Sequence, residues 1–429
     1  MDKVVILGAG IAGISSSYFL REKGIDSIIY EQENDYGGLC NSFEINGFNF
    51  DTFAHISFDI NTKKWLEERI PCYERIPEAL NYDQGRWIRH PVQNNLVDLP
   101  VEERIKHIMG FLTKGNKRIE NYGDWLQNTY GEMFAKTYPY RYTRKYWTVE
   151  PEQMEEKWIK GRMYEPSIEE VLRGAMTKKT EGVHYSKKAY YPRKGGIKAF
   201  LTPLIKEQSI VYNKKVCHIN STEKKIRFQD NSEINYDILV STIPITELCL
   251  LLNDVPFDIV NAASQLDYTS GIMVSLGLNR PNTSPSLWYY IYDEDIWPSR
   301  IYSPDWKSPH NVPKGCSAIQ AEIYYSKHRP IDLPINVILD KTIDQLLKLK
   351  LFSKDEIIVK DIRKKEYANI IFTPEIYSAR DKIHRFLDER GIRYAGRFGE
   401  WDYLWMGQSL LSGRRVAAEI IEERKQHDL

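Results

Sequence analysis

Residues 4–38 read VVILGAGIAGISSSYFLREKGIDSIIYEQENDYGG, and this stretch decides the fold of the first part of the chain. An apolar run at 4–7 predicts a strand, a glycine-rich turn leads into an amphipathic helix, and a second apolar run at 27–30 predicts another strand. Strand, glycine-rich turn, helix and strand in this order form the unit that binds dinucleotides in parallel α/β sheets.

Each glycine of the turn has its own task in such a unit. Gly8 permits the tight turn, Gly10 lets backbone N–H groups approach a pyrophosphate at the helix N-terminus, and Gly13 lets helix and strand pack closely. Glu31, at the end of the second strand, can accept hydrogen bonds from ribose hydroxyls. We therefore expect these residues to hold a dinucleotide.

A second glycine pair, Gly37-Gly38, follows Glu31 closely. It resembles the extended fingerprint of flavoproteins that bind FAD, in which the second pair also lies near the cofactor. The resemblance favours FAD over NAD and adds Gly38 to the expected cofactor site.

Length and charge limit the class of protein. A chain of 429 residues is too long for one core and predicts two or three domains. Lys and Arg number 59 and so do Asp and Glu, so no global field attracts nucleic acid. The N-terminal apolar run is too short for a signal peptide, and no stretch reaches the roughly 20 apolar residues of a membrane span. We expect a cytoplasmic protein without membrane insertion.

Cysteine and aromatic usage add two expectations. The five cysteines are scattered without CxxC spacing, which argues against a disulfide framework and against a zinc site, so no metal is expected. The 28 Tyr and 10 Trp exceed what a core needs and suit a cleft for a carbohydrate or a nucleotide.

Along the chain, the hydrophobic period changes several times. Alternation around Asn46-Gly47 predicts a hairpin, residues 101–180 have helical period, and strand-like runs return at 210–241 and 271–325. The predicted fold class is α/β: a Rossmann-type FAD-binding domain with an inserted helical domain and a second, antiparallel β-sheet substrate domain. The expected boundaries are 1–64, 185–262 and 380–429 for the FAD-binding domain, 65–184 for the mainly helical domain and 263–379 for the β-sheet domain.

The C-terminal segment IRYAGRFGEWDYLWMGQSLLSGRR predicts a further strand and helix beside the cofactor. A strand at 392–395 leads through Gly396 to a helix that includes Gln408 and Ser409. A helix N-terminus at this point can hold the cofactor from the opposite side.

At this point the residues resemble the UDP-galactopyranose mutases, within the superfamily that includes protoporphyrinogen oxidase and the flavin amine oxidases. GRFGEWDY is similar to GRFGxWxY of the eukaryotic-type mutases, and HPVQNNLVDLP is similar to PFQNNxxxLP. RKYWTVEPEQMEEKWIKGR resembles the segment around KVWAVP, FAHISFDINTKKW resembles GPHIFHTDNKxVW, and AYYPRKGG resembles the flavoprotein PxGG turn.

The resemblance assigns roles to several residues of this chain. It implies that His55 lies beside the flavin ring, that Arg162 bridges diphosphate and flavin, and that Tyr403 hydrogen-bonds the diphosphate; these three are the expected catalytic residues. It also implies that Arg397 contacts FAD. The expected substrate-binding residues are Trp147, Tyr268, Arg280, Gln93 and Asn94.

Three positions depart from the family pattern. The second diphosphate arginine aligns with Asn279, so that Arg280, one position along a strand, points to the opposite face. A partner tyrosine is replaced near Ile371, with Tyr367 as a possible substitute, and Phe53-Ala54 stands before His55 where the family has Gly-Gly or Gly-Pro.

The resemblance implies a FAD-dependent mutase that interconverts pyranose and furanose forms of a nucleoside-diphosphate sugar, with N5 of reduced flavin attacking the anomeric carbon. NAD(P)H is a possible reductant, and a homo-oligomer is possible. Two alternatives stay open. One is a FAD-dependent oxidase or dehydrogenase of the protoporphyrinogen oxidase or amine oxidase type; the other is a flavoprotein that has become a binding module.

Overall fold

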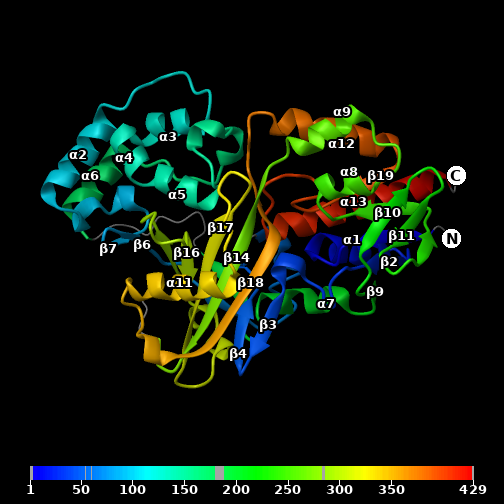
Figure 1. Cartoon of the computed structure of the whole chain (residues 1–429), viewed down its shortest axis with the longest axis horizontal. Helices are drawn as coiled ribbons and strands as arrows, with labels where there is room; N and C mark the ends of the chain where they lie inside the picture. The colour runs from blue at the N-terminus through cyan, green and yellow to red at the C-terminus, as the bar shows by residue number, and fades with distance from the viewer. Residues whose placement is uncertain (1–2, 54, 59, 179–187, 283–285, 428–429) are drawn as a thin grey trace.

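The computed structural model describes residues 3–53, 55–58, 60–178, 188–282 and 286–427. Ala54, expected to precede the flavin-facing histidine, lies outside the described residues. Figure 1 shows the part that contains β1, β2 and their helices at the right of the view and a lobe of helices α2 to α6 at the upper left. A second, large sheet lies between these two parts and below them.

The first sheet is parallel and has the strand order β19-β13-β1-β2-β9. Its strands are β1 (Val4–Leu7), β2 (Ser27–Tyr30), β9 (Ser209–Val211), β13 (Ile238–Ser241) and β19 (Ile392–Tyr394). Every residue of β1 is buried, as expected of a central parallel strand covered on both faces. The predicted strand–helix–strand unit is therefore confirmed, and the strand-like run that ends at 241 supplies β13 of the same sheet.

Helices cover this sheet, and α1 (Ile11–Arg21) packs against the long C-terminal helix α13 (Met406–His427). The Ser15 hydroxyl donates to the carbonyls of Ala12 and Leu410, which ties the two helices together. The other helices of this region are α7 (Thr202–Ile205), α8 (Ile245–Leu251), α9 (Phe257–Ser264) and α12 (Ile376–Glu389). A small antiparallel sheet lies beside them, with strands β10 (Val216–Asn220), β11 (Lys225–Phe228) and β12 (Glu233–Asn235).

The second large sheet has seven strands in the order β18-β14-β17-β16-β15-β6-β7. They are β6 (Ala79–Asp83), β7 (Arg86–Arg89), β14 (Tyr268–Leu278), β15 (Trp288–Ile291), β16 (Arg300–Tyr302), β17 (Ser317–Tyr325) and β18 (Ile357–Ile370). The pairs are antiparallel except for β15 with β6, so the predicted antiparallel sheet is in fact mixed. The short helix α10 (Pro304–Lys307) and α11 (Ile335–Leu347) flank it.

Strands β6 and β7 fall inside 65–184, which the sequence predicted to be mainly helical. Gln84 and Gly85 both have positive φ, which gives the tight hairpin turn that matches strand twist. The hairpin joins the edge of the sheet because β6 pairs with β15, which lies about 200 residues further along the chain. Local period therefore gave no sign of this pairing.

Two smaller pairs complete the strands. The predicted hairpin at Asn46-Gly47 is present as β3 (Ser42–Ile45) and β4 (Phe48–Asp51). Strand β5 (Cys72–Arg75) pairs with β8 (Ala189–Pro192).

The helical lobe consists of α2 (Val101–Leu112), α3 (Tyr122–Tyr130), α4 (Glu132–Thr137), α5 (Pro139–Tyr146) and α6 (Ile168–Met176). Helix α5 carries the buried Lys145, whose ammonium donates to the carbonyls of Ile291, Asp293 and Pro298 at 2.7–2.9 Å. This contact fixes the lobe against the second sheet. Across the described part of the chain, no helix is long and apolar enough to cross a membrane.

Candidate functional site

The N-terminus of α1 has the form of an anion cradle. Gly10 caps the helix without a side-chain hydrogen bond, and a Cβ built on Gly10 would meet no atom within 4 Å. A Cβ on Gly13, by contrast, would lie 2.0 Å from the Gly8 carbonyl oxygen. Gly13 is therefore required by packing, whereas Gly10 leaves open space in front of backbone donors, which is where a pyrophosphate binds in this motif.

Glu31 is held at the end of β2 by the backbone. Its carboxylate accepts from the N–H of Ala9 at 2.6 Å and from the N–H of Glu33 at 2.9 Å. Burial raises the pKa of Glu31, and the two N–H donors oppose that change. The side chain is thus fixed beside the glycine turn, at the position a ribose acceptor occupies in this motif.

The turn before α13 approaches α1 from the other side. The Gly396 N–H donates to the Ser412 hydroxyl at 2.7 Å, and the Arg397 guanidinium donates to the carbonyls of Leu404 and Ala368 at 2.9 and 3.1 Å. Gln408 accepts from the N–H of Trp405 at 2.9 Å. These contacts order the segment that begins α13. Arg397 lines the cavity described next, whereas Gln408 and Ser409 do not.

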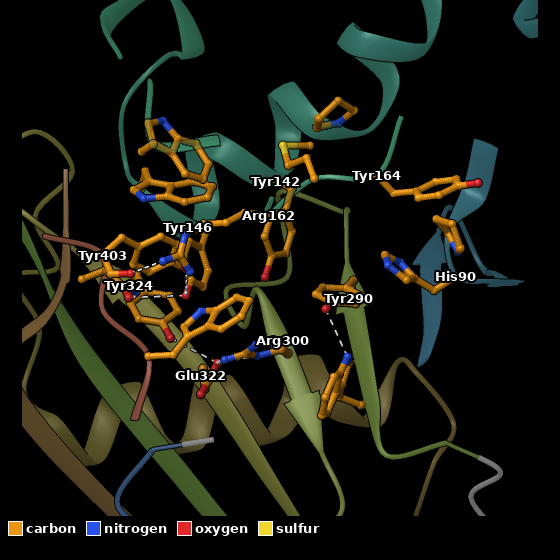
Figure 2. A pocket seen from close by; sticks show the side chains of 18 of the residues that line it. His90, Tyr142, Tyr146, Arg162, Tyr164, Tyr290, Arg300, Glu322, Tyr324 and Tyr403 are labelled. Carbon is orange, nitrogen blue, oxygen red and sulfur yellow. Dashed lines mark hydrogen bonds and ion pairs between the residues drawn. The ribbon is translucent and has the colours of Figure 1, made fainter. Parts of the chain in front are cut away.

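A cavity of about 320 Å³ lies where the three parts of the molecule meet. The dinucleotide-binding part contributes His55 and Arg397, the second sheet contributes Arg300, Glu322 and Tyr324, and the helical lobe contributes several aromatic side chains. Most of its wall is aromatic, and Figure 2 shows tyrosines from both the lobe and the sheet pointing into it. The aromatic lining from the lobe and from the segment that follows it is Tyr122, Tyr130, Phe134, Tyr138, Tyr142, Tyr146, Trp147, Trp158 and Tyr164.

Arg162 lies in this cavity and has no carboxylate partner among the described residues. Its guanidinium stacks on the rings of Tyr403 and Trp405, with its carbon 4.2 and 4.5 Å from the ring centroids. One nitrogen donates to the Tyr403 carbonyl, and the other, Nη1, is buried without a hydrogen-bond partner. Burial lowers the pKa of Arg162 from its ordinary value, yet a guanidinium keeps its charge. The arrangement therefore leaves a cation without a counter-charge.

Tyr403 joins Arg162 to the lobe. Its hydroxyl lies 3.5 Å from the Tyr146 hydroxyl, which also donates to the Asn369 amide oxygen at 3.4 Å. Figure 2 shows Arg162, Tyr146 and Tyr403 grouped at one end of the cavity. Arg162 and Tyr403, predicted separately from distant segments, are thus brought into contact.

A buried ion pair lines the cavity, and it was not predicted from the sequence. Arg300, at the start of β16, contacts the Glu322 carboxylate at 2.7 and 2.8 Å, and the Tyr324 hydroxyl donates to the same carboxylate at 3.1 Å. Burial alone lowers the pKa of Arg300, but the Glu322 charge outweighs it and raises the pKa well above the ordinary value. An arginine within an apolar strand, in the run WPSRIYS, was the available signal.

His55 also lines the cavity. Its Nδ1 lies 3.0 Å from the Phe53 carbonyl oxygen, so Nδ1 carries the proton and Nε2 is left as an acceptor. Burial lowers the pKa of His55 to about 4, and the ring is neutral at neutral pH. Lys307, which also lines the cavity, pairs with Asp51 at 2.8 Å, and both side chains are buried.

The other predicted substrate residues are divided between the cavity and other places. Gln93 and Trp147 line it. Tyr268 stacks on Tyr367 with ring centroids 4.1 Å apart, and Arg280 pairs with Glu356 at 3.5 Å; neither lines the cavity. Asn94 is buried at 3% exposure and also lies outside the lining.

Several hydrogen-bond donors of the lining are buried without a partner. Besides Arg162 Nη1, these are the indole nitrogens of Trp147 and Trp158 and the hydroxyl of Tyr138. Buried polar groups in native proteins are nearly always hydrogen-bonded, so a surplus of donors points to a bound group rich in acceptors. The described residues contain no cluster of His, Cys, Asp and Glu that could hold a metal ion.

Comparison with known proteins gives the family and the fold of the chain. The model of the flavin containing amine oxidoreductase family matches residues 11–421. Among solved structures, a reduced UDP-galactopyranose mutase superposes with a TM-score of 0.92 at 22% identity, over 98% of this chain and 96% of that one. A putative protoporphyrinogen oxidase from Exiguobacterium superposes with a TM-score of 0.76 at 15% identity, over 98% and 99% of the two chains. At these identities the likeness shows the fold.

Curated relatives match over short stretches. All-trans-retinol 13,14-reductase of Danio rerio is 28% identical over 106 residues, which are 24% of this chain and 16% of that protein. The 4,4'-diaponeurosporene oxygenase of Staphylococcus aureus is 38% identical over 109 residues, 22% of each chain. These relatives therefore share a part of the chain and not its whole length.

Proposed function

The chain belongs to the flavin containing amine oxidoreductase family, and within that family we propose that it is a FAD-dependent mutase of a nucleoside-diphosphate sugar. The observation that carries this proposal is Arg162: a partly buried guanidinium in an aromatic cavity, without a carboxylate partner and with one nitrogen lacking any partner. A diphosphate supplies the negative charge and the acceptor oxygens that this group lacks. The likeness to a reduced UDP-galactopyranose mutase supports the same choice.

The residues at the glycine turn fit FAD as the bound dinucleotide. Gly10 leaves space before the α1 N-terminus, and Glu31 is fixed at the ribose position. Arg397 lines the cavity and follows Gly396, where an added Cβ would lie 2.8 Å from Ala12 of α1. When bound and reduced, FAD would supply the nucleophile for the anomeric carbon.

The chain's own residues then have separate tasks. Arg162 and the Tyr403 hydroxyl stabilise the charge of the departing and returning diphosphate, as fixed donors do for developing anions. The aromatic walls of the lobe exclude water and hold a planar base. Nε2 of His55, neutral and unprotonated, can accept a hydrogen bond at the flavin end.

A second candidate is an oxidase or dehydrogenase, in which the flavin takes a hydride from an amine or alicyclic substrate. The observation that favours it is the aromatic lining, which also suits an apolar substrate.

One experiment separates the two. The dithionite-reduced protein is incubated with UDP-, GDP- and dTDP-sugars, and the products are separated by chromatography. For a mutase we expect furanose and pyranose forms to interconvert for many turnovers without consumption of NAD(P)H or oxygen, and no conversion by the oxidised protein. Anaerobic bleaching of oxidised flavin by substrate, one equivalent per flavin, with no isomerised sugar, would establish the oxidase instead.

A further inference from the structure

Helix α5 ends in an unusual way beside the cavity. Its last residue, Tyr146, and the C-cap residue Trp147 both line the cavity, and Thr148 follows with φ of +65°. The N–H groups of Trp147 and Thr148 both donate to the Thr143 carbonyl, at 2.8 and 3.2 Å, as at helix ends closed by a left-handed residue. Glycine usually takes that place, because a β-branched residue is strained at positive φ.

The Thr148 hydroxyl has contacts that hold the strained backbone in place. It donates to the Trp147 carbonyl at 2.5 Å and lies 2.6 Å from the Ser326 hydroxyl. Ser326 Oγ also accepts from the His328 N–H at 3.0 Å. With the Thr148 proton committed to the Trp147 carbonyl, Ser326 is the donor to Thr148. Both side chains are buried, Thr148 at 5% and Ser326 at 7% exposure, so these bonds are shielded from water.

Ser326 is itself anchored by a tight turn after β17. Backbone bonds join Ser326 and Arg329 in both directions at 3.2 Å, and the Arg329 guanidinium donates to the Arg144 carbonyl on α5 at 2.9 Å. His328 contacts the carboxylate of Asp267, the residue before β14, at 2.7 Å. The turn therefore joins the second sheet to the end of α5.

We propose that Ser326 and Thr148 are positioning residues for the binding site: Ser326 holds Thr148 in the left-handed conformation, and this sets the places of Tyr146 and Trp147 in the cavity wall. Backbone strain kept by its surroundings is typical of functional sites. The test by UDP binding rests on the proposed function. The test by melting temperature and circular dichroism rests on the geometry alone.

Two substitutions of the same residue separate positioning from simple loss of a hydroxyl. Thr148→Ala keeps the strained Cβ but removes the hydroxyl, whereas Thr148→Gly removes both strain and hydroxyl. We expect Thr148→Ala to weaken UDP binding to the flavin-loaded protein about fivefold, the effect of one lost hydrogen bond, and Thr148→Gly to bind UDP nearly as the parent does. Equal losses in both variants would overturn the proposal.

Ser326→Ala supplies the second arm. It should weaken UDP binding about as much as Thr148→Ala does, and the double variant with Thr148→Gly should recover affinity, because no strain is left to hold. Ser27→Ala is the matched control, since it removes a comparable hydroxyl contact, 2.7 Å from Ser17, away from the cavity. A Ser326→Ala loss that persists in the Thr148→Gly background would refute the positioning role.

Failure of the proposed function can be recognised separately. If the parent protein does not bind UDP, the proposed function fails, and near-UV circular dichroism and thermal melting decide the inference. Lower Tm and altered aromatic ellipticity in Thr148→Ala and in Ser326→Ala, with near-parent values in Thr148→Gly and in Thr148→Gly combined with Ser326→Ala, would support the positioning role. If the effects of Ser326→Ala and Thr148→Gly simply add in the double variant, the proposal is overturned.

Discussion

Replacing Arg162 by methionine is the most informative perturbation of the cavity. Methionine keeps an unbranched chain that packs on the rings of Tyr403 and Trp405, so the change mainly removes the charge and the N–H donors. Without ligand, the protein loses the bond to the Tyr403 carbonyl and the stacking of the cation, each of about 1 kcal/mol. It also loses a partly buried charge that has no counter-charge. Keeping such a charge costs the folded protein about as much free energy as these contacts contribute, or more. We expect the stability of the free protein to change by about 1 kcal/mol or less.

When a diphosphate is the ligand, the same substitution should weaken its binding. Truncating one partner of a buried, hydrogen-bonded charge pair costs about 2–5 kcal/mol. Since each 1.4 kcal/mol is a factor of ten, UDP should bind at least about 30-fold more weakly. The assay is a titration of UDP and UDP-galactose against flavin fluorescence, together with thermal melting of both proteins.

Arg280→Met is the matched control. Arg280 is also half-buried and was predicted from the sequence as a substrate residue, but it pairs with Glu356 outside the cavity. It should leave UDP affinity unchanged. The reasoning is refuted if Arg162→Met binds UDP as tightly as the parent, or if Arg280→Met loses as much affinity as Arg162→Met does.

Three further predictions follow from single features. Gly10→Val should leave folding of the flavin-free protein intact, because a Cβ there meets nothing within 4 Å, yet abolish FAD binding; an unaltered flavin content after purification would contradict this. Lys307→Met should lower the free energy of unfolding by about 3–5 kcal/mol in urea titration, because it leaves the buried Asp51 carboxylate without its cation, and Asp51→Asn combined with it should recover part of the loss; equal stability of parent and single variant would disprove it. Burial lowers the pKa values of His55, His107 and His384 to about 4. Between about pH 6.5 and 4 the unfolded chain therefore binds more protons than the folded protein, and the free energy of unfolding should fall as the pH falls through that window. His107→Gln should make this fall less steep, and an unchanged slope would show that His107 is not responsible.

The sequence predicted best what is local. The glycine turn, α1 and the acid at the end of β2 depend on a short stretch in which residue type and backbone conformation are directly linked, and the structure confirms that unit. The hairpin at Asn46-Gly47 was predictable for the same reason. The resemblance located Arg162 and Tyr403 in separate segments, and the fold places them in contact.

What could not be predicted depends on pairing between distant strands. Arg300 and Glu322 meet because β16 lies beside β17 in register, and neither residue carries a motif. Arg280 and Arg300 were not distinguishable by type, since only the topology decides which end of the sheet reaches the cavity. The β6–β7 hairpin joined the second sheet through β15, far along the chain, so no local period indicated its place.

The charges of the cavity argue for an anionic ligand. Arg300 is neutralised by Glu322, and Lys307 is neutralised by Asp51, so neither adds net charge to the cavity. Arg162 and Arg397 have no carboxylate partner within ion-pair distance among the described residues, and Arg397 is satisfied mainly by backbone carbonyls. The cavity therefore carries positive charge at the end where Tyr403 lies, within walls of low polarity that strengthen its field. A cationic amine would be repelled there, whereas a diphosphate would be attracted, and this separates the proposed substrate class from that of an amine oxidase on electrostatic grounds.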